Sequence, residues 1–117
     1  AGALIVSPAE EHPMAPHDAF ADDMTLAEGM ARYEEYVTEP VTRLLASWAG
    51  LRTFSPDRTL VLGRDSAQPD FIWCAGQGGY GMQSSPAAGK LLADLVNNET
   101  PAIDRTAVDA LSPARFR

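Results

Sequence analysis

The fold expected for this chain is decided by residues 71–83, which read FIWCAGQGGYGMQ. The apolar run at 71–75 predicts a strand, and the glycine-rich loop at 76–81 follows it directly. Beyond the loop, the apolar spacing of residues 85–96 predicts a helix. The sequence therefore predicts a strand–glycine loop–helix unit.

The ends of this helix are also indicated. Ser84 or Ser85 can cap its first turn, and Pro86 falls where a first-turn proline is tolerated. Two asparagines at 97–98 end it. Residues 100–117 are punctuated by prolines and are expected to form a tail.

The glycine loop matches the pattern G-x-G-x-x-G, which is typical of dinucleotide-binding units. Such a unit needs a second buried strand after its helix, and the residues here are instead NNETP at 97–101. An independent Rossmann unit is therefore rejected. Two interpretations stay open: a loop whose amide groups approach a planar or anionic ligand, and a plain tight turn, which is the simpler interpretation of a lone motif.

Outward from this unit, residues 55–58 (SPDR) and 69–70 predict turns, and residues 59–62 predict a strand. Near the start of the chain, residues 4–7 read as a short strand ended by Pro8, and residues 9–23 as a loop.

A helix is expected to begin at Thr25, which has capping-box spacing to Glu28, and to stop at 39–40. Its apolar stripe consists of Leu26, Met30, Tyr33 and Val37. Residues 41–51 fit either a helix or a strand.

The composition bounds the class of protein. The chain has 117 residues, of which 45% are apolar and 21% charged, enough for one globular domain at most. Its net charge is −7, and nine acidic residues but only one basic residue fall within residues 1–40. An acidic chain without a basic cluster argues against nucleic acid and anionic membrane surfaces as partners. No apolar run reaches the length of a membrane span.

Few side chains outside the loop suggest chemistry. Cys74 is the only cysteine, which excludes an internal disulfide, fits a reducing, cytoplasmic location, and is read as a small buried apolar residue. His12 and His17 have no partners at metal-ligand spacing, so no metal is expected. The chain starts without an initiator methionine and enters an apolar run at once, so we expect a piece of a longer polypeptide.

Several sequence blocks occur in a characteristic order. They are WAGLR at 48–52, SPD at 55–57, LVLG at 60–63, the stretch 71–83 and PAAG at 86–89. Together they resemble the C-terminal portion of FAD-dependent amino-acid oxidoreductases of the D-amino-acid oxidase, glycine oxidase and sarcosine oxidase family. The resemblance implies an α+β fragment of a larger two-domain flavoenzyme. Residues 1–50 would end the substrate-binding domain, and residues 51–117 would return to the FAD-binding domain, whose Rossmann segment would lie upstream.

The resemblance also implies roles for individual residues. Arg52 matches the arginine that holds the substrate α-carboxylate, although a random arginine would more simply lie on the surface. The residues that match the loop at the pyrimidine edge of the flavin are Gly78, Gly79, Tyr80, Gly81 and Met82. Gln83 matches a polar residue near flavin and substrate, with a solvent-facing helix residue as the equal alternative. No catalytic side chain is implied, because a neutral amine can lose hydride directly.

The implied function is oxidation of the CH–NH bond of an amino acid by hydride transfer to flavin N5. The fragment alone is expected to bind FAD poorly and to self-associate through exposed strand edges. One alternative is a free-standing small acidic interaction module. Another is a related flavoenzyme that acts on a hydroxy acid or glycerol phosphate. The sequence leaves open the amino acid, its stereochemistry and the electron acceptor.

Overall fold

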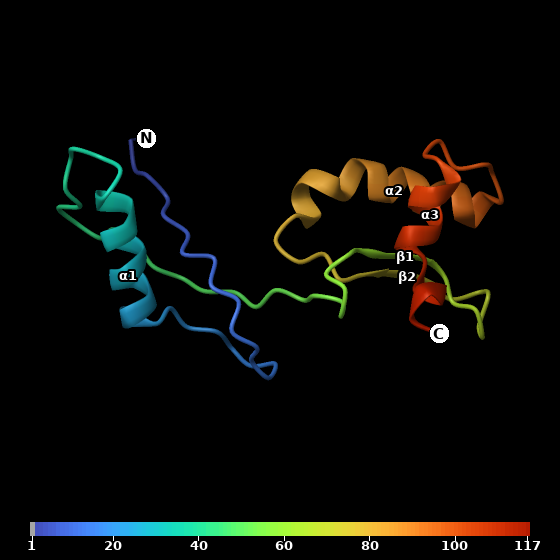
Figure 1. The fold of residues 1–117 in the computed structure, drawn as a ribbon, viewed down its shortest axis with the longest axis horizontal. Helices are drawn as coiled ribbons and strands as arrows, with labels where there is room; N and C mark the ends of the chain where they lie inside the picture. The colour runs from blue at the N-terminus through green and yellow to red at the C-terminus, as the bar shows by residue number, and fades with distance from the viewer. Residues whose placement is uncertain (1) are drawn as a thin grey trace. The chain divides into compact units, whose positions relative to one another are not determined.

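A computed structural model describes residues 2–117. The chain divides into two compact units, Ala1–Leu51 (unit 1) and Arg52–Arg117 (unit 2), and each is considered by itself. The elements are helix α1 in unit 1 and, in unit 2, a two-stranded sheet, helices α2 and α3, and a short 3-10 helix (Figure 1). The predicted α+β class is confirmed.

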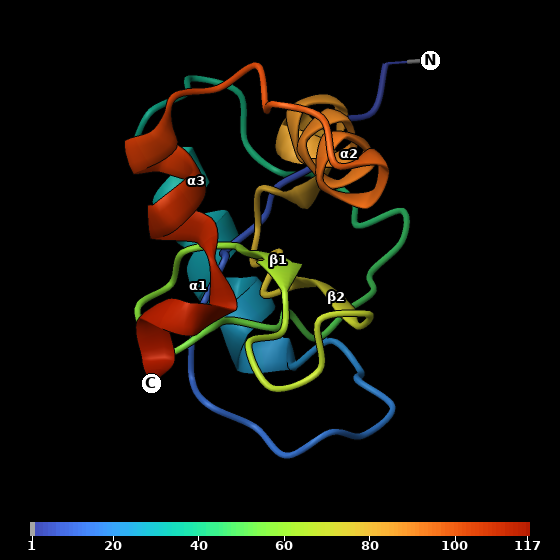
Figure 2. The ribbon, with the colours of Figure 1, turned by 90° about the vertical axis from the view of Figure 1, so that its right-hand side faces the viewer.

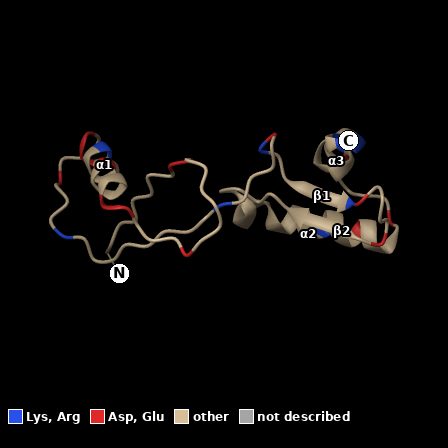
Figure 3. Cartoon of the chain, turned by 90° about the horizontal axis from the view of Figure 1, so that it is seen from below, with Lys and Arg blue, Asp and Glu red and all other residues tan. Residues whose placement is uncertain are grey.

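Helix α1 spans Asp23–Glu34. Its cap is Asp22, whose carboxylate accepts hydrogen bonds from the Thr25 amide at 2.8 Å and the Thr25 hydroxyl at 2.9 Å. The predicted capping box was therefore wrong, because the carboxylate three residues earlier accepts the amide proton. The predicted end near Glu39 was also too late. Asp and Glu positions are spread along the backbone of unit 1 (Figure 3).

The remainder of unit 1 has no regular secondary structure in its described residues 2–51. The strand predicted at 4–7 was wrong: Leu4 is 66% and Ile5 72% exposed, and an apolar run without a pairing partner does not form a strand. Residues 41–51 form neither the helix nor the strand considered for them. Gly29 is buried, and an added Cβ there would lie 2.6 Å from Cγ of Pro8.

The sheet of unit 2 is an antiparallel hairpin. Strand β1 spans Val61–Arg64 and strand β2 spans Ile72–Ala75, with Val61 opposite Ala75 and Arg64 opposite Ile72. Both predicted strands therefore exist, with β1 displaced by two residues. The predicted turn at 69–70 is closed by the Phe71 amide, which donates to the Gln68 carbonyl at 2.8 Å. An antiparallel hairpin is not a βαβ unit, so it agrees with rejecting an independent Rossmann unit.

Helix α2 spans Gly81–Asn97 and begins four residues before the predicted start. Ser84 and Ser85 are therefore inside the helix, not at its cap. Their hydroxyls donate to earlier carbonyls, Ser84 to Tyr80 and Ser85 to Met82, both at 2.9 Å. Pro86 lies inside the helix and has no N–H for the carbonyl of Met82, so the Ser85 hydroxyl supplies that donor. The predicted end was correct, with Asn98 in a left-handed conformation at φ 57°.

The segment predicted as a tail contains two further elements. Helix α3 spans Arg105–Leu111 and is capped by Asp104, and a 3-10 helix, η1, spans Pro113–Phe116. Figures 1 and 2 show α2 along the hairpin and α3 across it, and both helices contact β1.

The core of unit 2 forms where these elements meet. Its buried apolar residues are Leu62, Ala88 and Leu91, and residues of α3 such as Val108 and Leu111 pack against them. Asp94 of α2 is also buried; its Oδ1 pairs with Lys90, and its Oδ2 has no hydrogen-bond partner within residues 2–117. This charged pair lies within one helix.

One strand residue departs from its prediction. Cys74 is exposed, so its predicted burial was wrong, although it pairs directly with the buried Leu62 of β1. No described helix is long and apolar enough to cross a membrane. Residues 2–117 contain no group of three or more potential metal-ligating side chains.

Candidate functional site

The glycine loop leaves β2 and is fixed to the segment that begins unit 2. The amide of Gly78 donates to the carbonyl of Thr53 at 2.9 Å, and Tyr80 closes a turn by donating to the Gln77 carbonyl at 3.2 Å. Gly76 and Gly78 have φ values of 68° and 53°, a left-handed conformation that disfavours residues with a Cβ. The loop conformation therefore depends on glycine at these two positions.

Phe54 packs directly against the loop. A Cβ added at Gly78 would lie 2.8 Å from Cε1 of Phe54, so only glycine allows this approach. The guanidinium carbons of Arg52 and Arg58 each lie 5.3 Å from the centre of the same ring. Cation–π attraction holds both side chains near the ring, and both bring positive charge to this end of unit 2.

Arg52 lies beside the glycine loop. A Cβ added at Gly79 would be 3.0 Å from its Nη1 atom, and the Arg52 side chain is half-buried. Gly79 itself is exposed. The structure therefore brings Arg52 together with Gly78 and Gly79, which are 26 and 27 residues further along the chain.

The loop ends at the N-terminus of α2, where the backbone amides of the first turn have no carbonyl partners in the helix. Tyr80 occupies the cap position and makes no side-chain hydrogen bond to these amides, and the first turn carries no acidic residue. The partial positive charge of the helix N-terminus is therefore not neutralised locally. A Cβ at Gly81 would lie 2.9 Å from Cβ of Gln77, so the chain is closely packed here also.

The last two predicted site residues lie differently. Met82 is 92% exposed, and Gln83 is also exposed, with no hydrogen bond from its side chain to residues 2–117. In this structure their side chains do not join the group formed by Arg52, Phe54 and the glycines. Only their backbone belongs to the loop and helix start.

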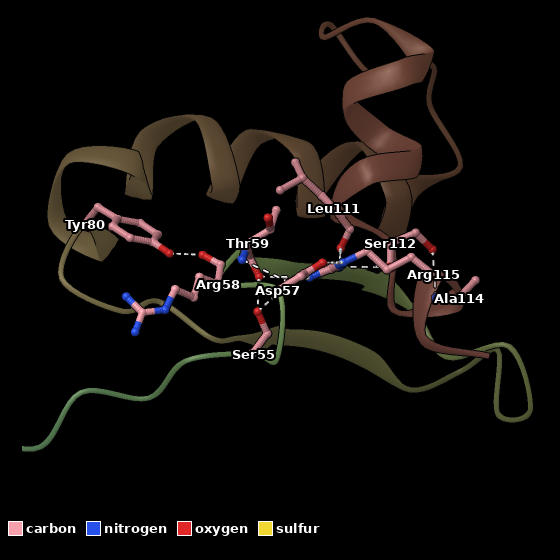
Figure 4. A network of polar contacts seen from close by, with 9 residues as sticks. All are labelled: Ser55, Asp57, Arg58, Thr59, Tyr80, Leu111, Ser112, Ala114 and Arg115. Carbon is pink, nitrogen blue, oxygen red and sulfur yellow. Dashed lines mark hydrogen bonds and ion pairs between the residues drawn. The ribbon is translucent and has the colours of Figure 1, made fainter. Parts of the chain in front are cut away.

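The sequence did not predict a polar network that joins Tyr80 of the loop to residues 57–58 and to Arg115 (Figure 4). The hydroxyl of Tyr80 donates to the carbonyl of Arg58, and the adjacent Asp57 forms a two-point ion pair with Arg115, at 2.7 and 3.1 Å. Hydrogen bonds from Arg115 and from the Thr59 amide hold the pKa of Asp57 well below its ordinary value of 3.8. The turn at 55–58 was predicted, but no local pattern identifies a partner 58 residues away.

A shallow groove of about 390 Å³ lies near the network, and its lining is mainly apolar. It includes Phe54, Trp73 and Phe116, with an ion pair between Asp65 and Arg117 at 3.2 Å. The indole N–H of Trp73 donates to Asp65 at 3.0 Å and lowers the pKa of this carboxyl. Arg52 and residues 78–83 do not line the groove, but Phe54 and Gly76 do, so the groove adjoins the candidate site.

The geometry first defines a class of site: an arginine, exposed glycine backbone and an uncapped helix N-terminus, suited to a ligand that carries anionic or hydrogen-bond-accepting groups. A family model described as FAD dependent oxidoreductase matches residues 1–95 of the chain. The match covers more than half of the sequence, and the chain belongs to this family of FAD-dependent oxidoreductases.

The residues present fit the cofactor of this family. A flavin presents a planar ring edge with acceptor atoms, and close backbone approach to such a ring requires positions without a Cβ. Gly79 is exposed and lies at the loop surface, next to the uncapped start of α2. Backbone amides in such a position can donate hydrogen bonds to the acceptor atoms of a planar ring.

Proposed function

We propose that the chain is the C-terminal part of an enzyme that oxidises the CH–NH bond of an amino acid. When bound, FAD supplies the acceptor for the two electrons and the hydrogen that leave the substrate as hydride. The observation that carries the proposal is the position of the Arg52 guanidinium beside Gly79, at the uncapped start of α2.

Arg52 is proposed to bind the substrate carboxylate. Its planar guanidinium offers paired N–H groups that match the two carboxylate oxygens, so one contact fixes both position and orientation. The ring of Phe54, against which the guanidinium lies, restricts the side chain before substrate arrives. The chain's own contribution to catalysis is then orientation of the Cα–H bond, and it needs no side-chain base.

Backbone groups of residues 78–83 are proposed to face the cofactor. Negative charge develops near the pyrimidine edge of a flavin as it is reduced, and fixed backbone dipoles stabilise this charge without reorganising. The exposed side chain of Gln83 is proposed to complete this edge or contact the substrate only when the remainder of the enzyme is present.

The two parts of the chain are proposed to belong to different domains of the whole enzyme. Residues 1–50 would form the end of the substrate-binding domain, and residues 51–117 would return to the FAD-binding domain. The segment that binds the ADP portion of FAD would precede residue 1 in a longer polypeptide. The amino-acid substrate and this segment are the proposed partners, and a cytoplasmic location is proposed with them.

The test uses the protein encoded by the complete reading frame, screened against glycine, sarcosine and L- and D-amino acids. We expect Arg52→Lys to raise KM for the best substrate at least about tenfold, equivalent to ~1.4 kcal/mol, because Lys lacks the planar fork. The flavin content should stay unchanged. Arg43→Lys, an exposed substitution in unit 1, is the matched control.

Two results would contradict the proposal. One is an unchanged KM in Arg52→Lys. The other is equal activity on an amine that lacks the carboxylate. A hydroxy acid or glycerol phosphate as the best substrate would replace the proposed reaction with that of a related flavoenzyme.

A further inference from the structure

Arg115 lies in the segment after residue 95, outside the region matched by the family model, yet it reaches back to the start of unit 2. Its side chain is 14% exposed. Its Nε and Nη2 atoms donate to the two carboxylate oxygens of Asp57, and Nη2 also donates to the Thr59 carbonyl at 2.9 Å. Nη1 donates to the carbonyls of Leu111 and Ser112, at 2.8 and 3.0 Å. These contacts use all five N–H donors of a guanidinium, which a lysine cannot reproduce.

Asp57 is also part of a turn, residues 55–59, which we call the Asp57 turn. The Asp57 carboxylate also accepts from the Ser55 hydroxyl at 2.8 Å and from the Thr59 amide at 3.0 Å. It therefore holds both sides of the turn. Arg58, between them, has φ 62°, a left-handed conformation that a residue with a Cβ keeps only where its surroundings hold it.

In the Asp57 turn, the carbonyl of Arg58 faces the side chain of Tyr80. The Tyr80 hydroxyl donates to this carbonyl, and Figure 4 shows the two groups pointing toward each other. Tyr80 is the cap residue of α2 and lies between Gly79 and Gly81. A side chain anchored at its hydroxyl end limits the movement of the backbone that carries it, which is the backbone of the candidate site.

We propose that Arg115 is a positioning residue for the glycine loop, acting through the Asp57 turn and the hydroxyl of Tyr80. The chain after residue 95 thus contributes to the site without touching its ligand. The link between Arg115 and Tyr80 rests on the contacts above, whereas its meaning for a flavin rests on the proposed function.

The first test measures amide chemical shifts by NMR in the 117-residue chain. We expect Arg115→Lys to displace the resonances of Gly78, Gly79 and Gly81. Arg105→Lys is the matched control, because Arg105 forms an exposed ion pair with Asp109 in the same segment. In a Tyr80→Phe background, Arg115→Lys should still displace Asp57 but should add nothing further at the three glycines.

A general loss of structure would not produce this pattern, because it would affect the glycines in either background. Equal displacement of the glycines with and without the Tyr80 hydroxyl would overturn the proposal. So would displacement confined to the Asp57 turn. If Arg115→Lys does not fold, the test rests on the single variant Tyr80→Phe. Resonances of the three glycines that are the same in Tyr80→Phe and in the wild-type chain would then contradict the proposal.

The second test uses the complete flavin-containing protein and follows the visible absorbance band and the reduction potential of the flavin. Arg115→Lys should shift both, Arg105→Lys neither, and Arg115→Lys should add nothing in the Tyr80→Phe background. A complete protein without flavin would contradict the proposed function but leave the NMR result standing. A flavin spectrum and potential that Arg115→Lys leaves unchanged would instead refute the role of Arg115.

Discussion

At the scale of single residues, the candidate site depends on positions where a Cβ is excluded. Gly78 combines a left-handed φ of 53° with an added-Cβ distance of 2.8 Å to Phe54, whereas Gly89 in α2 has open space around it. The sequence indicated the glycines of the loop, and the family resemblance assigned Arg52 to the substrate carboxylate. It did not indicate Phe54, because nothing in the local pattern distinguishes a ring that packs on a loop from one in the core.

This difference between two glycines can be measured. Gly78→Ala should destabilise the chain by about 1–3 kcal/mol, from left-handed strain and overlap with Phe54. Gly89→Ala should stabilise it by about 0.5–1 kcal/mol, because alanine costs less conformational entropy within a helix. Urea denaturation gives both values. A neutral Gly78→Ala would show that the loop does not pack as described.

The lowered pKa of Asp57 predicts how the stability of the fold depends on pH. Its pKa is lowered in the folded state, chiefly by Arg115, so ionised Asp57 stabilises the fold. That contribution is complete above the ordinary value of 3.8, declines as the pH falls below it, and is gone once the carboxyl is protonated in the folded state too. Asp22 and Asp65 shift in the same direction, so the comparison must be with Asp57→Asn.

The thermal unfolding midpoint of the wild-type chain should therefore fall more steeply below pH 3.8 than that of Asp57→Asn. Parallel curves for the two proteins would contradict the two-point contact between Asp57 and Arg115.

At the scale of elements, predictions were confirmed where a local sequence pattern belongs to a segment that also has a pairing or packing partner in the fold. Both strands of the hairpin and the end of α2 at Asn98 are of this kind. The start of α2 was misplaced because Pro86 was read as a first-turn residue, whereas the Ser85 hydroxyl replaces the missing amide donor. Helix α3 was missed because seven residues give too short a period to recognise, and packing on β1 stabilises it.

The proline inside α2 provides a test at this scale. Pro86→Ala restores an amide donor for the Met82 carbonyl and removes the steric conflict of an interior proline, so it should stabilise the chain by about 1–2 kcal/mol. Ser85→Ala should destabilise the wild-type chain more than the Pro86→Ala variant. Thermal denaturation of the four proteins measures this coupling, and equal effects of Ser85→Ala in both backgrounds would refute the proposed substitution of donors.

At the scale of the whole molecule, the chain belongs to the FAD-dependent oxidoreductase family, and many of its large apolar side chains are exposed. Phe20 is 85% and Trp48 67% exposed, and each strand of the two-stranded sheet has one unpaired edge. The missing strand partners also explain why apolar runs such as residues 4–7 misled the sequence-based prediction. A run that can form a strand does so only beside another strand.

These surfaces predict self-association of the isolated chain. Its weight-average mass should rise with concentration in analytical ultracentrifugation, because unpaired strand edges and apolar patches favour contact between copies. Cys74→Lys adds charge to exposed β2 and should reduce the effect. Cys74→Ser, without the charge, controls for disulfide formation between copies. A constant monomer mass at all concentrations would contradict this prediction.

The measurement that tests the central claim most directly is the flavin content of two purified proteins. These are the 117-residue chain and the polypeptide encoded by the complete reading frame. We predict about one FAD for each complete polypeptide and little or none on the chain alone, since residues 78–83 are proposed to supply only one edge of the cofactor site. A folded complete polypeptide without FAD, or stoichiometric FAD on the chain alone, would contradict the account.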